Sequence, residues 1–257
     1  MSTPKTLVIV PTYNEVESAP RLISRVTELL SDVHILVVDD GSPDGTANVV
    51  EAMAEGELDG RIHVMRRKEK EGLGAAYVAG FTWGIAHGYE ALVEMDADGS
   101  HRPEDLVQLV KVSRANPHLD LVIGSRWVNG GAVRNWAKSR ELLSRAANKY
   151  AKLMLGVGVK DVTAGFRVYS TSIIKQIDFS TVLSQGYCFQ IEMTRKVLAL
   201  NGKIREVPIT FIEREFGVSK MNMKIVVEAM LRVTYWGLGF KSVIKSGNLR
   251  KNRSICT

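Results

Sequence analysis

The feature that most constrains the fold of this 257-residue chain is a regular alternation of short β-branched runs with longer amphipathic stretches. The short runs have the length and composition of buried strands, and the longer stretches show apolar spacing near 3.6 residues or helix-start signals such as Pro103 followed by two acidic residues. The predicted strands are 7–10, 35–38, 62–65, 92–95 and 121–123, and the predicted helices are 17–30, 44–55, 72–87 and 103–115.

This alternation predicts an α/β fold with a mostly parallel sheet covered by helices on both faces. Ligands of such sheets bind at the carboxyl ends of the strands. After Arg126 the pattern changes to a Gly-rich turn, a basic helix, a strand, a helix and a last strand, at 129–131, 139–155, 166–169, 189–200 and 204–211. No Pro- or Ser-rich linker and no internal repeat interrupts the chain, which favours one continuous domain over residues 1–222.

The two cysteines, Cys188 and Cys256, lie far apart and form neither a disulfide framework nor a C-x-x-C metal site. At the N-terminus, only four apolar residues, 7–10, precede Pro11, which is too short for a secretory signal. We therefore expect a reducing, cytoplasmic location.

The formal net charge of +6 is concentrated toward the C-terminus. Residues 201–257 contain eleven Lys and Arg against four Asp and Glu, and residues 126–152 contain seven against one. Such basic segments bind nucleic acid, anionic lipid or a phosphorylated substrate, and charge alone does not choose among these partners.

The C-terminal segment, residues 223–257, combines an amphipathic helix with a basic tail. Its charges Lys224, Glu228 and Arg232 recur every four residues among apolar ones, so the segment falls short of the roughly 20 nearly uncharged residues of a membrane span. The helix either lies on an anionic membrane surface, with Tyr235 and Trp236 at headgroup depth, or packs on the protein's own core.

Carboxylates follow two of the predicted strands. Asp39 and Asp40 follow one strand, and Asp96, Ala97 and Asp98 follow another. Either pair alone is typical of a turn or a helix cap, but two acidic strand ends in one parallel sheet converge on the same crevice. Clustered carboxylates are costly without a cation, and hard oxygen ligands together with a diphosphate favour Mg²⁺ or Mn²⁺.

Basic residues that suit phosphate groups lie near other strand ends: Arg126, Arg140, Arg214 and Lys220. The signatures of a P-loop, a zincin, a dinucleotide-binding fingerprint and a nucleophile elbow are missing. The sequence therefore predicts a pocket for two phosphorylated substrates and a divalent cation, and a nucleic-acid-binding protein is the alternative from another class.

The ordered motifs resemble the family 2 glycosyltransferases of GT-A fold, and among them the dolichyl- and polyprenyl-phosphate mannose synthases, with a basic C-terminal end like that of actinobacterial members. These motifs are VPTYNE (10–15), VVDDGSPDGT (37–46), GLGAAYVAGF (72–81), MDADGSHRPEDL (95–106), IGSRWVNGG (123–131), NWAKSRELLSRAAN (135–148), DVTAGFRVY (161–169), GYCFQIEM (186–193) and EREFGVSKM (213–221).

The resemblance implies mannosyl transfer from GDP-mannose to a polyprenyl phosphate, with inversion and with Mg²⁺ or Mn²⁺ as cofactor. It implies that the nucleoside is held by Pro11, Tyr13, Glu15, Val38 and Asp40, and the diphosphate and sugar by Asp96, Ala97 and Asp98. The implied metal ligands are Asp96, Asp98 and Ser100, the last at a position where many relatives have Gln.

In the same way, Arg126 and Arg140 are expected to grip the acceptor phosphate, while Arg214 and Lys220 close over the donor diphosphate. Asp161 and Glu192 are alternatives as sugar-positioning acids or helix-start residues. The implied enzyme is peripheral at the cytoplasmic face of a membrane, with or without a separate membrane-anchoring protein, and it does not bind nucleic acid. A UDP-glucose-dependent enzyme acting on the same lipid carrier is the nearest rival.

Overall fold

The computed structural model describes residues 6–55, 58, 60–182, 184, 186–213 and 229–239. The phosphate-binding candidates Arg214 and Lys220 lie outside these residues, as do 223–228 and 240–257 of the predicted C-terminal segment.

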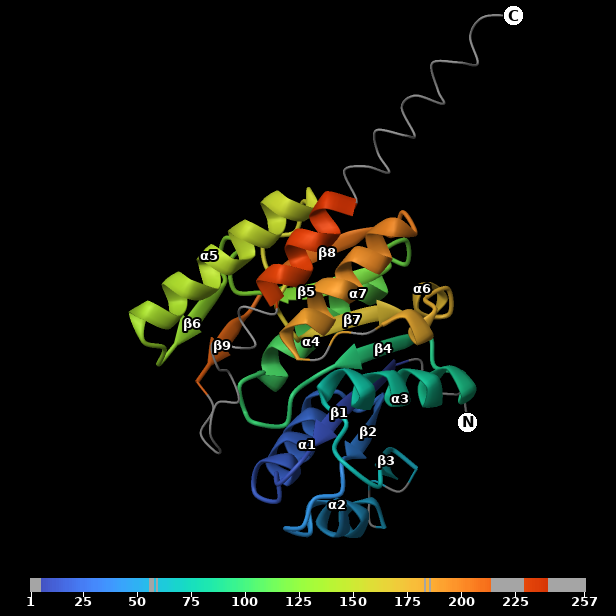
Figure 1. Cartoon of the computed structure of the whole chain (residues 1–257). Helices are drawn as coiled ribbons and strands as arrows, with labels where there is room; N and C mark the ends of the chain where they lie inside the picture. The colour runs from blue at the N-terminus through green and yellow to red at the C-terminus, as the bar shows by residue number, and fades with distance from the viewer. Residues whose placement is uncertain are drawn as a thin grey trace, which may run out of the picture.

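A seven-stranded sheet in the order β3-β2-β1-β4-β7-β5-β8 forms the centre of the molecule (Figure 1). Its strands are β1 (Thr6–Thr12), β2 (Val33–Asp39), β3 (Ile62–Arg66), β4 (Ala91–Glu94), β5 (Leu121–Ser125), β7 (Arg167–Ser170) and β8 (Ile204–Pro208). All neighbours pair in parallel except β7, which is antiparallel to both β4 and β5. The predicted mixed, mostly parallel α/β sheet is therefore confirmed.

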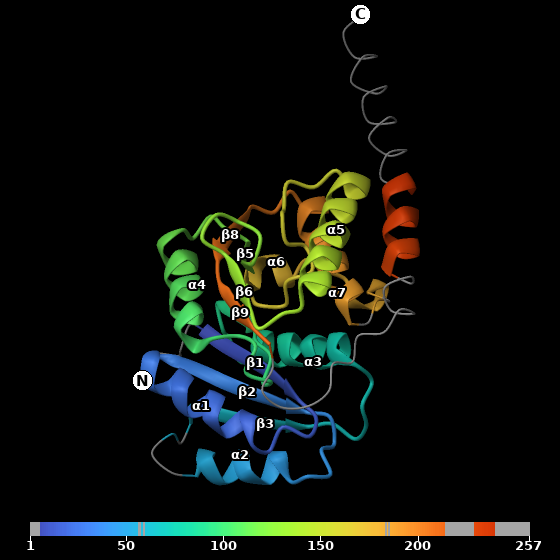
Figure 2. The ribbon, with the colours of Figure 1, turned by 90° about the vertical axis from the view of Figure 1, so that its left-hand side faces the viewer.

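Helices cover both faces of the sheet (Figures 1 and 2). They are α1 (Ser18–Leu29), α2 (Thr46–Ala54), α3 (Leu73–Ala86), α4 (Pro103–Ala115), α5 (Lys138–Leu155) and α7 (Tyr187–Ala199), with the short α6 (Thr171–Ile174) and a 3-10 turn at Phe179–Thr181. Alternate residues of each strand face opposite ways. In β1, Leu7 and Ile9 pack with α3 and α7, whereas Val8 and Val10 pack with α1 and α4.

Close packing on the first of these faces depends on two glycines of α3. A Cβ on Gly80 would lie 2.5 Å from Ile9 Cγ2, and one on Gly84 would lie 2.5 Å from Leu92 Cδ2. Any side chain at either position would push α3 away from β1 and β4.

The structure corrects the predicted last strand and adds one that was not predicted. Where one strand over 204–211 was predicted, the chain forms two, β8 and β9 (Thr210–Ile212), and β9 pairs with β6 (Ala132–Arg134), a segment to which the sequence assigned no element. The division occurs at Ile209, whose amide donates to Ser125 O while its carbonyl accepts from the amide of Ala132. The chain thus leaves the main sheet where β5 ends.

Residues 229–239 are helical and pack beside α5 (Figures 1 and 2). The hydroxyls of Tyr150 and Thr234 are hydrogen-bonded, and the Arg195 guanidinium lies 5.0 Å from the ring centroid of Trp236. This part of the C-terminal segment therefore contacts the protein itself. Among the described residues, no helix combines the length and apolarity that crossing a membrane requires.

Candidate functional site

The acidic segments predicted to converge do lie at one edge of the sheet. Strand β1 is parallel to both β2 and β4, so Asp40 after β2 and Asp96 after β4 flank the carboxyl end of β1. Because β7 runs antiparallel between β4 and β5, the carboxyl end of β5 and the segment before Arg167 reach the same edge. The candidate site is assembled along this edge from four loops.

The loops after β1 and β2 are joined by hydrogen bonds. The backbone amides of Asn14, Glu15 and Val16 donate to Ser42 Oγ, Thr46 Oγ1 and Asp44 Oδ2 at 3.0–3.1 Å. Asp39 accepts from Thr12 Oγ1 at 2.9 Å and from the Ser42 amide at 2.9 Å, so it is a structural residue. These bonds fix the two loops relative to each other before any ligand binds.

Among the residues expected to hold the nucleoside, Asp40 has the clearest electrostatic partner. Its Oδ1 accepts from Arg67 Nη1 at 2.6 Å. Burial raises the pKa of Asp40 above its ordinary value, although the Arg67 charge opposes this shift. Lys70 Nζ lies 3.8 Å from the ring centroid of Tyr13, next to the same loop.

The other nucleoside-binding candidates differ in what they offer a ligand. Glu15 accepts from Ser18 Oγ at 2.6 Å, and Pro11 is half-buried at the end of β1. Val38 is buried, and its side chain packs in the core with α3, so only its backbone is available to a nucleoside.

The D-x-D segment after β4 is held in place by its neighbours. Asp96 Oδ1 accepts from the Tyr77 hydroxyl at 3.0 Å, and the Asp96 amide donates to His101 Nδ1 at 3.0 Å. Burial, then the charges of Asp96 and Glu94, raise the pKa of Tyr77 well above its ordinary value, so Tyr77 remains a donor. Burial lowers the pKa of His101, so the imidazole stays neutral and its Nδ1 accepts.

Ala97, Asp98 and Ser100 of the same segment are buried. Asp98 Oδ1 accepts from the Ser100 amide at 3.0 Å, and Ala97 is buried. Glu94, fully buried at the end of β4, is not a surface ligand, since burial raises the pKa of its carboxyl to about 8.

The donor set of this segment fits a divalent cation that takes further ligands from a substrate. Asp96 and Asp98 supply two carboxylates, and Ser100 Oγ is a buried hydroxyl oxygen without a hydrogen-bond partner among the described residues. Within the same residues no group of three His, Cys, Asp or Glu side chains is arranged to hold a metal by itself. Two carboxylates with diphosphate oxygens and water are a usual Mg²⁺ environment.

Arg126, directly after β5, is buried against Asp161. Its Nε donates to Asp161 Oδ2 at 2.8 Å, and its Nη2 donates to Asp161 Oδ1 at 2.7 Å. Nη2 also lies 2.9 Å from Thr163 Oγ1. Asp161 therefore orients Arg126 and does not start a helix. Glu192, the other acid considered for the sugar, lies inside α7 and accepts from the Ser184 amide at 3.1 Å.

Arg140, in the first turn of α5, forms an ion pair with Glu213 and lies 4.2 Å from the ring centroid of Trp136. Phe211 connects this basic group to the D-x-D segment. Its ring centroid lies 5.7 Å from that of His101 and 5.5 Å from Arg126 Cζ. Phe211 thus lies between Arg126 and the His101 that supports the D-x-D segment.

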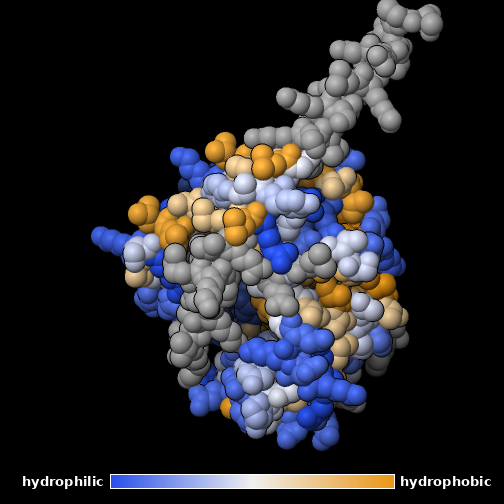
Figure 3. All heavy atoms as spheres, in the orientation of Figure 1, coloured by the Kyte–Doolittle hydropathy of each residue, from blue (hydrophilic) through white to orange (hydrophobic). Residues whose placement is uncertain are grey.

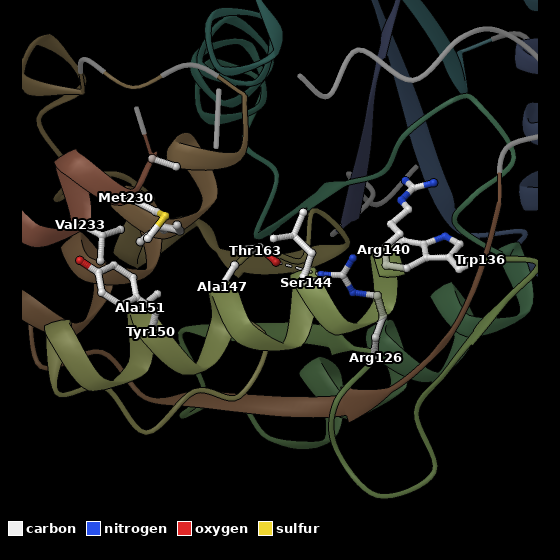
Figure 4. Close-up of a pocket in the computed structure, with 13 residues that line it drawn as sticks. Arg126, Trp136, Arg140, Ser144, Ala147, Tyr150, Ala151, Thr163, Met230 and Val233 are labelled. Atoms are coloured by element: carbon white, nitrogen blue, oxygen red, sulfur yellow. Dashed lines mark hydrogen bonds between the residues drawn. The ribbon is translucent and has the colours of Figure 1, made fainter. Parts of the chain in front are cut away.

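A mostly apolar groove leads away from the two arginines, between α5 and residues 229–239 (Figure 4). Arg126, Arg140 and Trp136 gather at one end, and Tyr150, Met230 and Val233 lie toward the other. Its remaining lining residues are Leu143, Ser144, Ala147, Ala151, Thr163, Ile191 and Ala229. An amphiphile with one anionic end matches this distribution of polarity.

Sequence reasoning missed several residues of this edge. Tyr77 and Gln190 lie within the predicted helices 72–87 and 189–200, Phe211 lies in the predicted strand 204–211, and Arg67 follows the predicted strand 62–65 without a motif of its own. His101, beside the D-x-D segment, was interpreted as a loop residue. The side chains of the others reach the site from elements distant in sequence, so no local spacing marks them.

Comparison with known proteins agrees with this arrangement. The family model for glycosyl transferase family 2 matches residues 7–178. The chain is 53% identical over 236 residues to the polyprenol monophosphomannose synthase of Mycolicibacterium smegmatis, covering 92% of this chain and 88% of that protein. It is 48% identical to the undecaprenyl-phosphate mannosyltransferase of Micrococcus luteus, covering 91% of this chain and 94% of that protein.

A solved structure shares the fold. Glucosyl-3-phosphoglycerate synthase from Mycobacterium tuberculosis, crystallised with Mn²⁺, UDP-glucose and phosphoglyceric acid, superimposes with a TM-score of 0.65 at 18% identity, covering 92% of this chain and 79% of that one. The sheet order, the acidic loops at its edge and the match over residues 7–178 together show that this chain belongs to glycosyl transferase family 2.

Proposed function

We propose that this protein transfers mannose from GDP-mannose to a polyprenyl phosphate, giving polyprenyl-phosphate β-mannose and GDP. Two relatives at about half sequence identity, whose names describe mannosyl transfer to polyprenyl carriers, support this acceptor class. The single structural observation that carries the proposal is the groove between α5 and residues 229–239, which is apolar along its length and has Arg126 and Arg140 at one end.

The groove explains why the acceptor is an amphiphile. Leu143, Ala147 and Val233 offer contact area to isoprene units, which gain free energy on leaving water. A phosphate at the other end would lie beside Arg140, where it would compete with the carboxylate of Glu213. Arg126 would add a second positive charge, held in position by Asp161.

The proposed reaction is a single displacement. An oxygen of the acceptor phosphate attacks the anomeric carbon of mannose, the bond from that carbon to the diphosphate breaks, and GDP leaves with the electron pair. Attack from the opposite face inverts α-mannose to β-mannose. A phosphate monoester is largely dianionic near neutral pH, since its second pKa is about 6, so no general base is required.

The donor site lies at the carboxyl ends of β1, β2 and β4. Asp40, held by Arg67, and the joined loops after β1 and β2 would bind the nucleoside. Asp96 and Asp98 would hold a Mg²⁺ or Mn²⁺ ion, with Ser100 Oγ as a further oxygen, and such an ion stabilises negative charge on a departing diphosphate. The proposal assigns Arg214 and Lys220 to the same diphosphate.

We further propose that the catalytic unit, residues 1–222, works at the cytoplasmic face of a membrane and that 223–257 help to hold it there. Seven of the nine large apolar side chains exposed among the described residues belong to α5 and residues 229–239. They are Leu142, Leu143, Leu153, Met230, Leu231, Tyr235 and Leu238. In Figure 3 apolar side chains gather over the part of the molecule where these helices lie.

Basic residues are interspersed with the leucines of α5. Lys138, Arg145, Lys149 and Lys152 share the helix with one acid, Glu141. Leucines among lysines and arginines suit the headgroup region of an anionic bilayer. With α5 lying against the bilayer, the groove would be open to a lipid carrier, with or without a separate anchoring protein.

The test is transfer by the purified protein with labelled GDP-mannose or labelled UDP-glucose, a short polyprenyl phosphate, and Mg²⁺, Mn²⁺ or a chelator. The proposal requires GDP-mannose and a divalent cation, and a β-linked product by NMR. If the protein transferred sugar from UDP-glucose and not from GDP-mannose, it would be a glucosyltransferase instead. Transfer to a water-soluble phosphate but not to the polyprenyl phosphate would refute the lipid acceptor.

A further inference from the structure

The antiparallel strand β7 brings a glycine beside the first aspartate of the D-x-D segment. Glu94 of β4 pairs with Arg167 of β7, so continuing the register two residues in opposite directions along the two chains places Asp96 next to Gly165. Asp96 Oδ2 lies 3.9 Å from the point where a Cβ on Gly165 would be. Gly165 itself is half-buried, so part of it is exposed to solvent.

A buried amide faces the same space from α7. Gln190 Nε2 lies 3.8 Å from that Cβ point, and the Gln190 side chain is 2% exposed. Neither Nε2 nor Oε1 has a hydrogen-bond partner among the described residues. Arg167 fixes the helix here, since its Nη1 donates to Gln190 O at 3.0 Å. A buried primary amide without a partner is unfavourable and calls for an explanation.

The third wall of the space is His101, whose Cε1 lies 3.7 Å from the same point. The Nδ1 of His101 accepts from the Asp96 amide, and its ring stacks on Phe166 at 4.6 Å. The space is therefore bounded by a carboxylate that accepts, an amide that donates and accepts, and an imidazole C–H. An uncharged hydroxyl, which donates one hydrogen bond and accepts others, complements these groups.

We propose that Gln190 is a sugar-positioning residue, which binds a hydroxyl of the transferred hexose in the space that Gly165 leaves open beside Asp96. This inference rests on the proposed function for the presence of a nucleotide sugar, but not on its being GDP-mannose. The hydroxyl donates to the Asp96 carboxylate and accepts from Gln190 Nε2. A glycine at position 165 is required because any side chain there would occupy the site.

The competing explanation is internal. The Gln190 amide also reaches the buried Glu94 carboxyl, where hydrogen bonding by the amide lowers the pKa of that carboxyl against the larger effect of burial, although neither carboxyl oxygen has a partner at ordinary hydrogen-bond distance and angle among the described residues. If Gln190 served only Glu94, its loss would lower stability without changing how the sugar binds. Sugar affinity and stability must therefore be measured separately.

Gly165→Ala is the sharpest variant, because its methyl would meet no heavy atom closer than 3.7 Å and the backbone has no positive φ to strain. Its matched control is Gly158→Ala, where a Cβ would meet nothing within 4 Å. Gln190→Ala removes the amide, and Gln190→Glu keeps its shape but removes the donor. Calorimetry measures the affinity of each variant for GDP and for GDP-mannose, and a melting curve reports its stability.

We expect the affinity for GDP-mannose to fall by about tenfold in Gly165→Ala, Gln190→Ala and Gln190→Glu. The affinity of these variants for GDP should equal that of the parent protein. Gly158→Ala should change neither affinity. We also expect that, among GDP-mannose analogues that each lack one hydroxyl, one binds the parent protein more weakly than GDP-mannose does. The Gln190→Ala variant should bind that analogue and GDP-mannose equally well.

The inference is overturned if a variant loses affinity for GDP and for GDP-mannose equally. It is also overturned if a variant melts at a lower temperature while its affinity for GDP-mannose is unchanged. Failure of the proposed function is recognised separately, because the parent protein would then transfer no mannose from GDP-mannose. In that case the same comparison is made with UDP-glucose against UDP.

Discussion

Arg126 and Asp161 form a buried two-pronged ion pair, in which Nε and Nη2 of the arginine lie 2.8 and 2.7 Å from the two carboxylate oxygens. The Arg126 amide also donates to Asp161 Oδ2, at 2.9 Å. Asp161 thus fixes both the backbone and the side chain of the residue that follows β5. Arg126 lines the polar end of the groove, so under the proposed function this pair would set where an acceptor phosphate meets positive charge.

Arg126→Ala should raise KM for polyprenyl phosphate by about 10- to 100-fold, because a charge-assisted contact to the phosphate is lost. The affinity for GDP should change little. Asp161→Asn should raise the same KM and also lower stability by about 3–5 kcal/mol, because it leaves the buried arginine without a counter-charge. Initial rates over a range of acceptor concentrations and denaturant unfolding measure these effects. Equal losses of acceptor and GDP binding would argue against the acceptor role of Arg126.

Asp98→Ala should lower mannosyl transfer by about 100-fold or more while the protein stays folded, since it removes a carboxylate assigned to the cation. A chelator should abolish transfer by the parent protein, and added Mg²⁺ or Mn²⁺ should restore it. Asp178→Ala, which alters an exposed aspartate at the 3-10 turn, is the control. Unchanged transfer by Asp98→Ala, with a normal circular dichroism spectrum, would refute the metal assignment.

Replacing Leu142 and Leu153 together by serine should weaken binding to anionic vesicles by about tenfold or more, because two exposed leucines of α5 would no longer enter the bilayer surface. Val49→Ser alters an exposed apolar residue of α2 and is the matched control. Sedimentation with phosphatidylglycerol vesicles measures the partition. Retained binding of the double variant, with loss in the control, would assign the membrane face elsewhere.

Stability should fall as the pH drops below about 6.5, partly because of His34 and His63 on β2 and β3. Burial lowers the pKa of both imidazoles, and each is lowered further by a neighbouring histidine, His63 for His34 and His87 for His63. The unfolded chain therefore takes up protons at a pH where the folded protein resists them, which favours unfolding on acidification.

The change that tests this is His63→Gln, which should reduce the difference between Tm at about pH 7 and at about pH 5.5. His118→Gln, in the exposed loop after α4, should leave that difference unchanged. A pH dependence that is the same in His63→Gln as in the parent protein would contradict this origin.

The sequence by itself determined the strands, the helices and the edge where chemistry gathers. Strand length, helix periodicity and the Pro103 helix start are local properties, and they placed Asp40 and Asp96 correctly at the ends of two parallel strands, which lie on either side of β1. It missed β6 and the separation of β9 from β8, because the break at Ile209 depends on hydrogen bonds to Ser125 and Ala132, which are far away in sequence.

Only the tertiary structure decided which partners the site residues have. The insertion of β7 antiparallel between β4 and β5 brings Gly165 to Asp96, and the loop before it brings Asp161 to Arg126. The contact of α7 with Arg167 of β7 places Gln190 beside them. The ion pair joins residues 35 positions apart in the chain, and contacts at such a separation leave no periodic pattern in the sequence. Local sequence fixes which way a side chain faces, whereas the packing of distant elements fixes what that side chain meets.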